Sequence, residues 1–538
     1  MAIIMNKPTP TVKNHHRYRA APSPTGKVHI GTVRAYLPNF LLARKTGGKN
    51  ILRIEDTDTQ RNVLGSVEAA SQAMVEAYET VGITFDEGPH LGGEYGPYIQ
   101  SERLSIYQTH AEQLVGKGHA YYCFCSKERL AEVREIQNQN KQKPMYDGHC
   151  RDIDPNEARR RVENGEPYVI RMKFPKEGVT ICHDQIMGDV KFRNSDIEDQ
   201  VLIKQDGFPT YHLAVVVDDH LMNITTVIRG NDWAPSFPKH VKLYEYFGWE
   251  IPEFAHLPLI LNPDGRKKLS KRYGANSIVA RLREGYVKEG IVNYALLCGW
   301  APDPAVAHRD EIYTMEELIE LFDLSRVHNT PARYDQKKFD YINAKHIRRW
   351  SLDEFVERVL DWAENIVLKD FAIDQVSGLE DRELEIREKV TKYLPMWRSE
   401  PDKLKAALAL EQERITILSE LLDSTAFFFD EDLNWTDEDW NTKNHDKKEL
   451  AEALQGILPK LDILFCNENV AHEEWEAVVR GFADEHDWKH GDMFMALRSA
   501  ITGRLKSPPI LESIEAMGWE KTRKFIVQAI NYLGQMEI

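Results

Sequence analysis

The 538-residue sequence lacks several features that would place a protein in a special class. No apolar run approaches the roughly 20 residues that a membrane-spanning helix needs. The opening stretch has no charged segment followed by an apolar one, so it does not resemble a secretory signal. Six cysteines in a chain of this length do not form a disulfide framework. We therefore expect a cytoplasmic globular protein with no membrane span and roughly two to four domains.

Positive charge is scarce overall, because 85 acidic residues outnumber 69 lysines and arginines and give a net charge of −16. This balance argues against a protein coated for nonspecific nucleic-acid binding. Basic residues nevertheless gather in four runs, at 239–242, 266–272, 335–350 and 504–509. RNA binding needs only a local basic face, so it stays open, although each run alone is typical of a solvated helix face.

The hydrophobic pattern near the N-terminus predicts a βαβ unit. Apolar residues at helical spacing follow the stretch PSPTGKVHIGT (22–32), and KNILRIEDTD (49–58) has the composition of a buried strand. This order favours a Rossmann-type α/β fold with a doubly wound parallel sheet. Pro38 should kink the helix or cost it a hydrogen bond. The stretches 208–220 and 224–230 are so apolar that we expect both to be core strands.

Composition changes twice along the chain. Polar helix formers and short strands occupy residues 96–205, which suggests an α+β insertion in the Rossmann domain, and beyond about 275 nearly every segment has helical period. The expected organisation is a Rossmann domain at 17–95 and 206–265, an insertion at 96–205, a loop with helices at 266–350 and an all-α domain at 351–538. Four tryptophans of the helical half are candidates either for base stacking or for bundle core: Trp350, Trp397, Trp435 and Trp440.

Two stretches are suited to holding the phosphates of a nucleotide. In the first, Gly26 and Gly31 flank His29 where a helix should begin, and the unpaired N–H groups of a helix N-terminus attract anions. It is not a P-loop, and alone it also fits a plain strand–turn–helix junction. In the second, NPDGRKKLSKRYG (262–274), Lys268 and Lys271 lie three apart with a serine between them. That spacing makes a mobile cationic clamp suited to a triphosphate.

Together, HIGT (29–32) and KLSKR (268–272) resemble the His-x-Gly-His and Lys-Met-Ser-Lys-Ser motifs of class I aminoacyl-tRNA synthetases. Six stretches occur in order at spacings that resemble the bacterial-type glutamyl-tRNA synthetases: RAAPSPTGKVHIGT, RIEDTD, GPYIQSER, FPTYHLAVVVDDHLM, VIRGNDW and NPDGRKKLSKR. Thr32, Leu269 and Arg272 depart from the class pattern, and the glutamyl enzymes commonly show Thr32 and Arg272. The resemblance is dense from 17 to 350 and looser afterwards, although 498–518 resembles the end of that family's anticodon domain.

This resemblance implies an activity. The family attaches L-glutamate to tRNA(Glu) through a glutamyl-adenylate and transfers it to the 2′-OH of the terminal adenosine. Neither step needs a protein nucleophile, since orientation and charge neutralisation suffice. ATP would bring Mg²⁺, held mostly by phosphates and water. The insertion would bind the acceptor stem, the 266–350 helices would contact the stem, and 351–538 would read the anticodon in a monomer. Glutaminyl relatives have a β-barrel in this last region, which the helical period argues against.

The resemblance also implies residue roles. The catalytic set comprises His29, Thr32, Lys268 and Lys271. The ATP contacts comprise His29, Gly31, Asp232, Lys268, Leu269, Ser270 and Lys271. The glutamate contacts comprise Arg19, Ala21, Ser23, Glu55, Tyr211, Val215 and Arg229. Arg19 and Arg229 would grip carboxylates bidentately, Glu55 would bind the ammonium, and Arg229 would favour glutamate over glutamine. Val215 departs from family members that have Asn there, so a polar contact is missing.

Metal binding has one strong and one weak candidate. Cys123, Cys125 and Cys150 fall within 28 residues of the expected insertion. Some glutamyl enzymes carry zinc in this region, so one structural Zn²⁺ is a prediction, with three buried small hydrophobes as the alternative. The fourth ligand stays open among Asp152, His149 and Tyr146. Chemistry favours Asp or His, since tyrosinate is costly at neutral pH, whereas Tyr146 has the position proposed in related enzymes. The run Asp218-Asp219-His220 fits helix N-caps after a strand better than a metal site.

Two other functions fit part of the pattern. A class I-like nucleotidyltransferase would share the phosphate chemistry but would not need the helical half. A catalytically inactive RNA-binding paralogue would keep the helical half, but it would have no reason to retain His29, Glu55, Lys268, Lys271 and both arginines. We therefore expect a glutamyl-tRNA synthetase.

Overall fold

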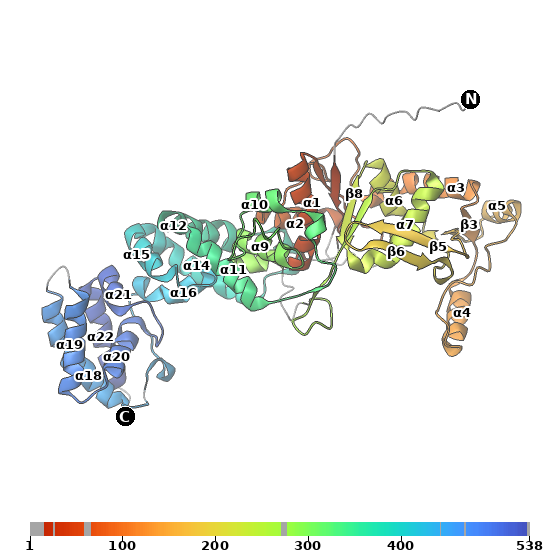
Figure 1. Cartoon of the computed structure of the whole chain (residues 1–538). Coiled ribbons are helices and arrows are strands. Elements are labelled where there is room, and N and C mark those ends of the chain that lie inside the picture. Colours follow the sequence, from red (N-terminus) through yellow and green to blue (C-terminus); the bar gives the residue numbers. More distant parts are fainter. Residues whose placement is uncertain are drawn as a thin grey trace. The chain divides into compact units, whose positions relative to one another are not determined.

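The structure, a computed structural model, describes residues 16–534 apart from 25–26, 59–65, 271–276, 442 and 467–469. It divides into two compact units. Figure 1 labels their helices and strands. Unit 1 comprises Met1–Ile278, Ile291–Phe339 and Phe371–Gly378, and unit 2 comprises Val279–Gly290, Asp340–Asp370 and Leu379–Ile538. In the part of the chain that is described, no helix is both long and apolar enough to cross a membrane.

Two parallel strand pairs form the centre of unit 1. Strand β1 (Arg17–Ala20) pairs with β2 (Lys49–Leu52) through the crossover helix α1 (Ile30–Thr46), and β8 (Thr226–Gly230) pairs with β9 (Glu253–Leu257) through α7 (Phe237–Phe247). The pairs adjoin where the Thr225 N–H donates to the Arg17 carbonyl at 3.0 Å. Parallel strands joined by helices confirm the Rossmann-type fold.

Helix α1 shows how the local sequence sets this geometry. His29 caps its N-terminus, and Gly47 ends it with a φ of 66°, a left-handed conformation that glycine adopts without strain. The helix is unbroken through Pro38, which is buried inside it. The proline therefore costs a hydrogen bond but does not end the helix.

The prediction of a strand over 208–220 is wrong, because these residues contain helix α6 (Tyr211–Leu221). Residues 213–219 are all buried, so the helix is enclosed on every side and shows no polar face. A fully buried helix and a buried strand have the same continuous apolar pattern, and periodicity cannot separate them. Asp218 and Asp219 lie in the C-terminal half of α6, so they are not N-caps.

Residues 96–205, predicted as an insertion, contain both strands and helices. Its strands β3 (Ala120–Cys123), β4 (Val169–Met172) and β7 (Val201–Ile203) make an antiparallel sheet, and β5 (Val179–Asp184) and β6 (Gly188–Arg193) form a hairpin. Its helices are α3 (Leu104–Gly116), α4 (Lys127–Gln139) and α5 (Pro155–Glu163). One apolar cluster contains both Met172 of the insertion and Val227 of the Rossmann sheet, so the insertion shares the core of unit 1.

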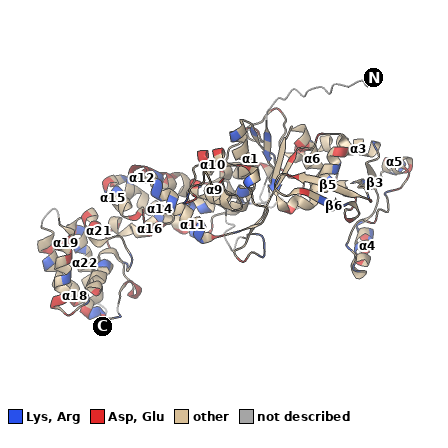
Figure 2. Cartoon of the chain, viewed as in Figure 1, with Lys and Arg blue, Asp and Glu red and all other residues tan. Residues whose placement is uncertain are grey.

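Further elements complete unit 1 and lead into unit 2. They are α2 (Val67–Thr80), β10 (Ile260–Leu261) parallel to β11 (Ala332–Arg333), α8 (Ile278–Arg283), α9 (Lys288–Leu297), α10 (Met315–Leu321), α11 (Gln336–Arg349) and α13 (Ala372–Ser377). The basic run predicted at 335–350 forms α11, where Figure 2 marks several Lys and Arg residues.

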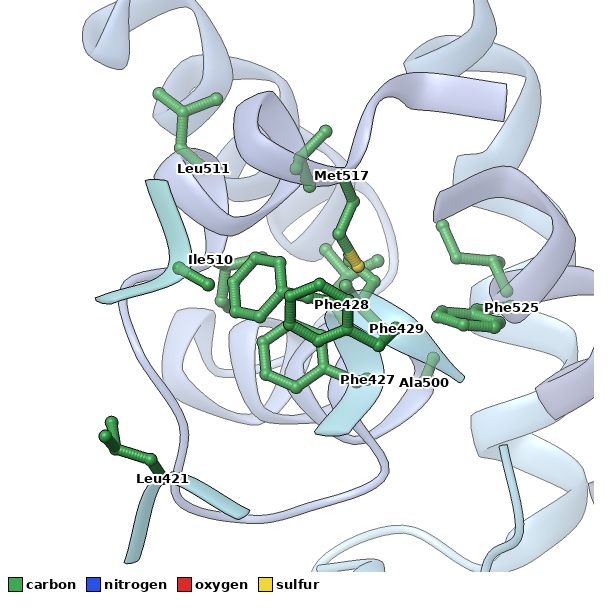
Figure 3. Close-up of a cluster of buried hydrophobic side chains, with 14 of the residues drawn as sticks. Leu421, Phe427, Phe428, Phe429, Ala500, Ile510, Leu511, Met517 and Phe525 are labelled. Carbon is green, nitrogen blue, oxygen red and sulfur yellow. The ribbon is translucent and has the colours of Figure 1, made fainter. Parts of the chain in front are cut away.

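Unit 2 is helical over the residues that are described. Its other helices are α12 (Leu352–Asp361), a π-helical turn (Trp362–Val367), α14 (Asp381–Ser399), α15 (Pro401–Glu411), α16 (Leu421–Ser424), α17 (Ala426–Phe429), α18 (Lys447–Leu464), α19 (His472–Glu485), α20 (His490–Thr502), α21 (Ile510–Met517) and α22 (Trp519–Gly534). The aromatic side chains Phe427–Phe429 pack beside Met517 and Phe525 in its core (Figure 3). Trp397, Trp435 and Trp440 belong to the same core, so they are packing residues rather than exposed stacking platforms.

Candidate active site

A pocket of about 250 Å³ opens at the carboxyl ends of β1, β8 and β9, where ligands bind in parallel α/β sheets. The residues that line it are Arg19, Ala21, Ser23, His29, Gly31, Thr32, Arg34, Ala35, Tyr36, Glu55, Tyr211, Arg229, Gly230, Asp232, Trp233, Leu257, Pro258, Leu259, Ile260, Lys268 and Leu269. The structure thus brings together in one pocket most of the residues singled out for ATP and for glutamate.

One side of the pocket is the start of α1. His29 Nδ1 accepts hydrogen bonds from the N–H groups of Gly31 (3.1 Å) and Thr32 (3.3 Å), and Thr32 Oγ1 accepts from the His29 N–H at 2.8 Å. Burial and then the charge of Lys268 lower the pKa of His29, so the imidazole is neutral near pH 7. Because Nδ1 accepts, the proton is on Nε2, which makes that N–H a donor for a ligand oxygen.

Lys268 also lines the pocket, and its Nζ lies 3.0 Å from a carboxylate oxygen of Asp232. Both side chains are exposed, at 60% and 41%, so the pair is weak and a phosphate can displace its acid. Leu269 also lines the pocket, but Ser270 does not, and its N–H donates to Asn262 Oδ1 at 3.0 Å. Lys271 lies outside the described residues.

Arg229 approaches the pocket from the end of β8 with its charge uncompensated. It donates to His256 Nε2, Tyr211 Oη and His240 Nδ1, each at 3.0 Å. Its remaining nitrogen, Nη2, is buried and has no hydrogen-bond partner. Within the described residues no carboxylate pairs with it, and a buried cation of this kind is costly unless a ligand satisfies it.

Arg19, the other predicted carboxylate partner, is already paired with a protein carboxylate. Its Nε donates to Asp219 Oδ1 at 3.1 Å, and Asp219 also accepts from Arg53 Nη1 at 2.7 Å. Arg53 is fully buried and donates from Nη2 to Glu55 Oε1 at 3.1 Å. Burial raises the pKa of Glu55, while Arg53 and Arg19 favour its ionised form. Asp219 therefore acts as the counter-ion beneath the pocket, a role that our prediction of an N-cap missed.

Asp218, the preceding residue of α6, has a similar role. It accepts from Arg103 Nε (2.8 Å), Gln100 Nε2 (2.9 Å) and Tyr107 Oη (2.8 Å). These residues lie at the start of the insertion, so the buried aspartate fixes the insertion to the Rossmann part. The metal alternative for this run is not supported, because both carboxylates are already occupied by hydrogen-bond donors.

Two further residues differ from expectation. Val215 is 1% exposed in the apolar core of unit 1 and does not line the pocket. Arg34 does line it, and sequence reasoning missed it. Its side chain is 2% exposed, its Nε donates to the Cys298 carbonyl at 2.7 Å, and Nη1 and Nη2 have no partner. The available signal was an arginine four residues after Ile30 and three before Leu37, which places it on the apolar face of the helix.

The three cysteines of the insertion converge. Their sulfur atoms all lie within 4.8 Å of one another, and Cys125 Sγ is 3.6 Å from Cys150 Sγ. Tyr146 Oη lies 3.4 Å from Cys123 Sγ and 3.8 Å from Cys125 Sγ. The structure does not bring Asp152 to the thiols, since its side chain is 87% exposed and lies 3.5 Å from Lys173 Nζ. His149 is exposed as well. Of the three predicted fourth ligands, only Tyr146 is in place.

Comparison with known proteins identifies the family of the chain. Residues 16–341 match the family model described as tRNA synthetases class I (E and Q), catalytic domain, and residues 385–530 match an anticodon binding domain. A glutamate–tRNA ligase of Treponema denticola is 40% identical over 519 residues, which cover 96% of this chain and 99% of the relative. One from Clostridioides difficile is 39% identical over 514 residues, covering 94% and 97%. The chain belongs to the glutamate–tRNA ligase family.

A solved member of the family has the same fold over its whole length. The crystal structure of a glutamate tRNA ligase from Elizabethkingia meningosepticum, in complex with its amino acid, superposes with a TM-score of 0.75 at 33% identity. It covers 96% of this chain and 99% of that chain. The pocket of unit 1 therefore falls in the region that matches the catalytic domain, and α14–α22 fall in the region that matches the anticodon-binding domain.

Proposed function

We propose that this chain attaches L-glutamate to tRNA(Glu) in two steps at the pocket of unit 1. In the first, an α-carboxylate oxygen of glutamate attacks the α-phosphorus of ATP, so that a mixed anhydride forms and pyrophosphate leaves. In the second, the 2′-OH of the terminal adenosine attacks the acyl carbon, the ester forms, AMP leaves and the hydroxyl proton is released to solvent. The pocket supplies cations, backbone donors and one buried acid, which suit a reaction that needs orientation and charge stabilisation.

The observation that carries this proposal is the unpartnered Nη2 of Arg229, buried at the wall of a pocket that also contains Glu55. A guanidinium without a counter-ion requires an anionic group on the ligand, and a carboxylate can accept bidentately. Glu55 provides the complementary anion for the ammonium group. A ligand with a side-chain carboxylate and an ammonium fits this pair, whereas a neutral amide would leave the charge of Arg229 uncompensated.

The phosphates of ATP would lie at the other side of the pocket. His29 Nε2–H and the N-terminus of α1 would donate to them, and Lys268 would move from Asp232 to the leaving pyrophosphate. The family motif assigns the same role to Lys271. Mg²⁺ would enter with ATP, held by phosphate oxygens and water. The insertion would bind the acceptor stem and residues 351–538 the anticodon. We also propose that the enzyme is a cytoplasmic monomer.

Aminoacylation with labelled glutamate and labelled glutamine, on purified tRNA(Glu) and tRNA(Gln), tests the function. We expect glutamate on tRNA(Glu) and no glutamine on either tRNA. Glutamate on both tRNAs would keep the reaction and make the enzyme the first step of an indirect route to glutaminyl-tRNA. If glutamate is transferred to neither tRNA, the proposal is wrong.

We further propose that Cys123, Cys125, Cys150 and Tyr146 hold one structural Zn²⁺. Three thiolates and one oxygen make a tetrahedral set of the kind zinc prefers. Metal analysis of the purified chain should find one zinc, Cys125→Ser should abolish it, and Tyr146→Phe should lower its affinity. Asp152→Asn is the matched control and should leave the zinc content unchanged, whereas a loss of zinc in that variant would return the fourth position to Asp152.

A further inference from the structure

A set of buried histidines surrounds Arg229 on the side away from the pocket. His256, in β9, lies against Arg229 Nε, and His240, in α7, lies against Nη1, both at 3.0 Å. His240 and His256 are 1% and 0% exposed. Their rings are therefore inaccessible to substrate, and any effect they have on catalysis must pass through the arginine.

The direction of these hydrogen bonds fixes the protonation of both rings. A guanidinium has only donors, so His256 Nε2 and His240 Nδ1 must accept through a lone pair. The proton of His256 is then on Nδ1, which lies 2.6 Å from Asp184 Oδ2. The proton of His240 is on Nε2, which lies 3.2 Å from His212 Nδ1. Both imidazoles are neutral, and each is held by a partner behind it.

Asp184 connects this arrangement to the insertion. It is the last residue of β5, and its other oxygen, Oδ1, accepts from the N–H groups of Ile186 and Met187 at 2.9 Å each. Its Oδ2 also accepts from the His256 N–H at 3.1 Å. With every acceptor direction in use and no exposed surface, the carboxylate holds one ring in one tautomer.

We propose that His240 and His256 are positioning residues, which orient Arg229 toward the side-chain carboxylate of glutamate and leave the charge of the arginine unneutralised. This inference rests on the proposed function. Two carboxylates in their place would hold the guanidinium equally well, but they would satisfy its charge and weaken its attraction for the substrate. Neutral acceptors supply orientation and leave the full charge for the ligand. Tyr211 Oη, the third acceptor, is neutral as well, since burial raises its pKa.

The surrounding charges favour neutral rings. The charged and titratable groups that face the two histidines are Arg229, Arg19, Lys239, Asp184, His212 and Tyr211. Burial, followed by the charge of Arg229, lowers the pKa of His240, and burial also lowers that of His256 although Asp184 opposes it. Protonation of either ring would remove the acceptor and place a second cation against the guanidinium.

Pairs of variants separate positioning from packing. Asn at 240 keeps an acceptor near the place of Nδ1, and Gln at 256 keeps one near the place of Nε2, whereas Leu at either position removes it. We expect His240→Leu and His256→Leu to raise the KM for glutamate about tenfold or more, with the KM for ATP and kcat much less affected. His240→Asn and His256→Gln should recover most of the loss. The matched control is His183→Asn, because His183 also bonds an aspartate on the same hairpin but is exposed.

The pH dependence gives a second readout. Since the pKa values of both rings lie below the usual 6.5, the wild-type KM for glutamate should be flat near pH 7 and should rise only at acidic pH, where the rings begin to take up protons. The double variant H240N/H256Q should lack this rise, while glutamate itself titrates identically in both. Melting temperatures identify any variant that fails to fold. If a Leu variant does not fold, the pH profile of the Asn and Gln variants still tests the proposal.

The outcomes distinguish the two proposals. If the wild type attaches no glutamate to tRNA, the proposed function fails. If the wild type is active but both Leu variants keep its KM for glutamate and its selectivity over glutamine, the positioning proposal alone is overturned. An acid rise that persists unchanged in H240N/H256Q would also contradict it.

Discussion

Both units bury an arginine, and the two side chains are satisfied in opposite ways. In unit 2, Arg283 is 1% exposed, and its Nη1 donates to Glu383 Oε1 at 2.9 Å and its Nη2 to the Lys369 carbonyl at 3.0 Å. In unit 1, Arg229 is 5% exposed and has only neutral acceptors, and its Nη2 has none. Arg283 is compensated by a protein carboxylate, whereas the charge of Arg229 stays available for an anionic group of a ligand.

The largest effect should come from breaking the compensated pair. Arg283→Leu leaves Glu383 buried without its partner, and the free energy of unfolding of unit 2 should fall by about 3–5 kcal/mol. Hydrogen exchange of α14 peptides followed by mass spectrometry measures this loss in the full chain. The double variant R283L/E383L should recover most of it, because no unpaired charge remains. A loss below about 1 kcal/mol in the single variant would remove the contrast between the two arginines.

Removing the uncompensated arginine, Arg229, should lower activity strongly and stability only slightly. Arg229→Gln takes away the buried charge that we assign to the glutamate side chain, so kcat/KM for glutamate should fall about 10²- to 10³-fold. The unfolding free energy should change by less than in Arg283→Leu, because the lost hydrogen bonds are offset by removal of an unpaired buried charge. Steady-state aminoacylation and a melting curve on the same sample measure both quantities. A variant that is fully active, or that melts as early as R283L, would contradict this assignment.

Acidification should act on the two units with opposite sign. Burial lowers the pKa of His212 to about 3 and also lowers that of His240, so the unfolded chain takes up protons first and unit 1 loses stability as the pH falls below about 6.5. At pH 5 the cost for His212 is about 2 kcal/mol. In unit 2, burial raises the pKa of Glu411 to about 6, so its folded state binds protons first and gains stability below that pH.

Hydrogen exchange at pH 7 and pH 5, corrected for the intrinsic rate, reports the opening free energy of each unit separately. We expect weaker protection in α6 and α7 and stronger protection in α15 at the lower pH. Glu411→Gln should abolish the gain in unit 2 without altering the loss in unit 1. Parallel changes in the two units would show that these buried groups do not control the acid response.

The contrast between the arginines also shows what the sequence could predict. The sequence could assign four residues to the site because each belongs to a short linear motif: His29, Glu55, Arg229 and Lys268. Parallel strand order brings such motifs to one edge of the sheet. The supporting groups were not found, since they depend on distant contacts. Asp184 meets His256 across 72 positions in the sequence, and Asp219 meets Arg19 across 200.

The helix at 211–221 was predicted as a strand for a related reason. Two acidic residues near its C-terminal end, Asp218 and Asp219, are buried because arginines from other elements pair with them. The local sequence pattern does not reveal these partners. Arg34 was missed because an arginine on an apolar helix face usually extends to solvent along its aliphatic stem. In each case the missing information was the tertiary partner of a buried charge.

The smallest effect should come from the charges at the rim of the pocket. Asp232 and Lys268 are both exposed, so Asp232→Asn should change the unfolding free energy by less than about 1 kcal/mol. If the carboxylate only restrains Lys268 until a phosphate arrives, its removal should alter the KM for ATP by no more than about fivefold and leave the KM for glutamate unchanged. ATP titrations at saturating glutamate and tRNA measure this. A large rise in the KM for ATP would instead support the direct ATP contact that the family resemblance implies for Asp232, and the rim pair would then belong with Arg229 among the groups whose proper partner is the ligand.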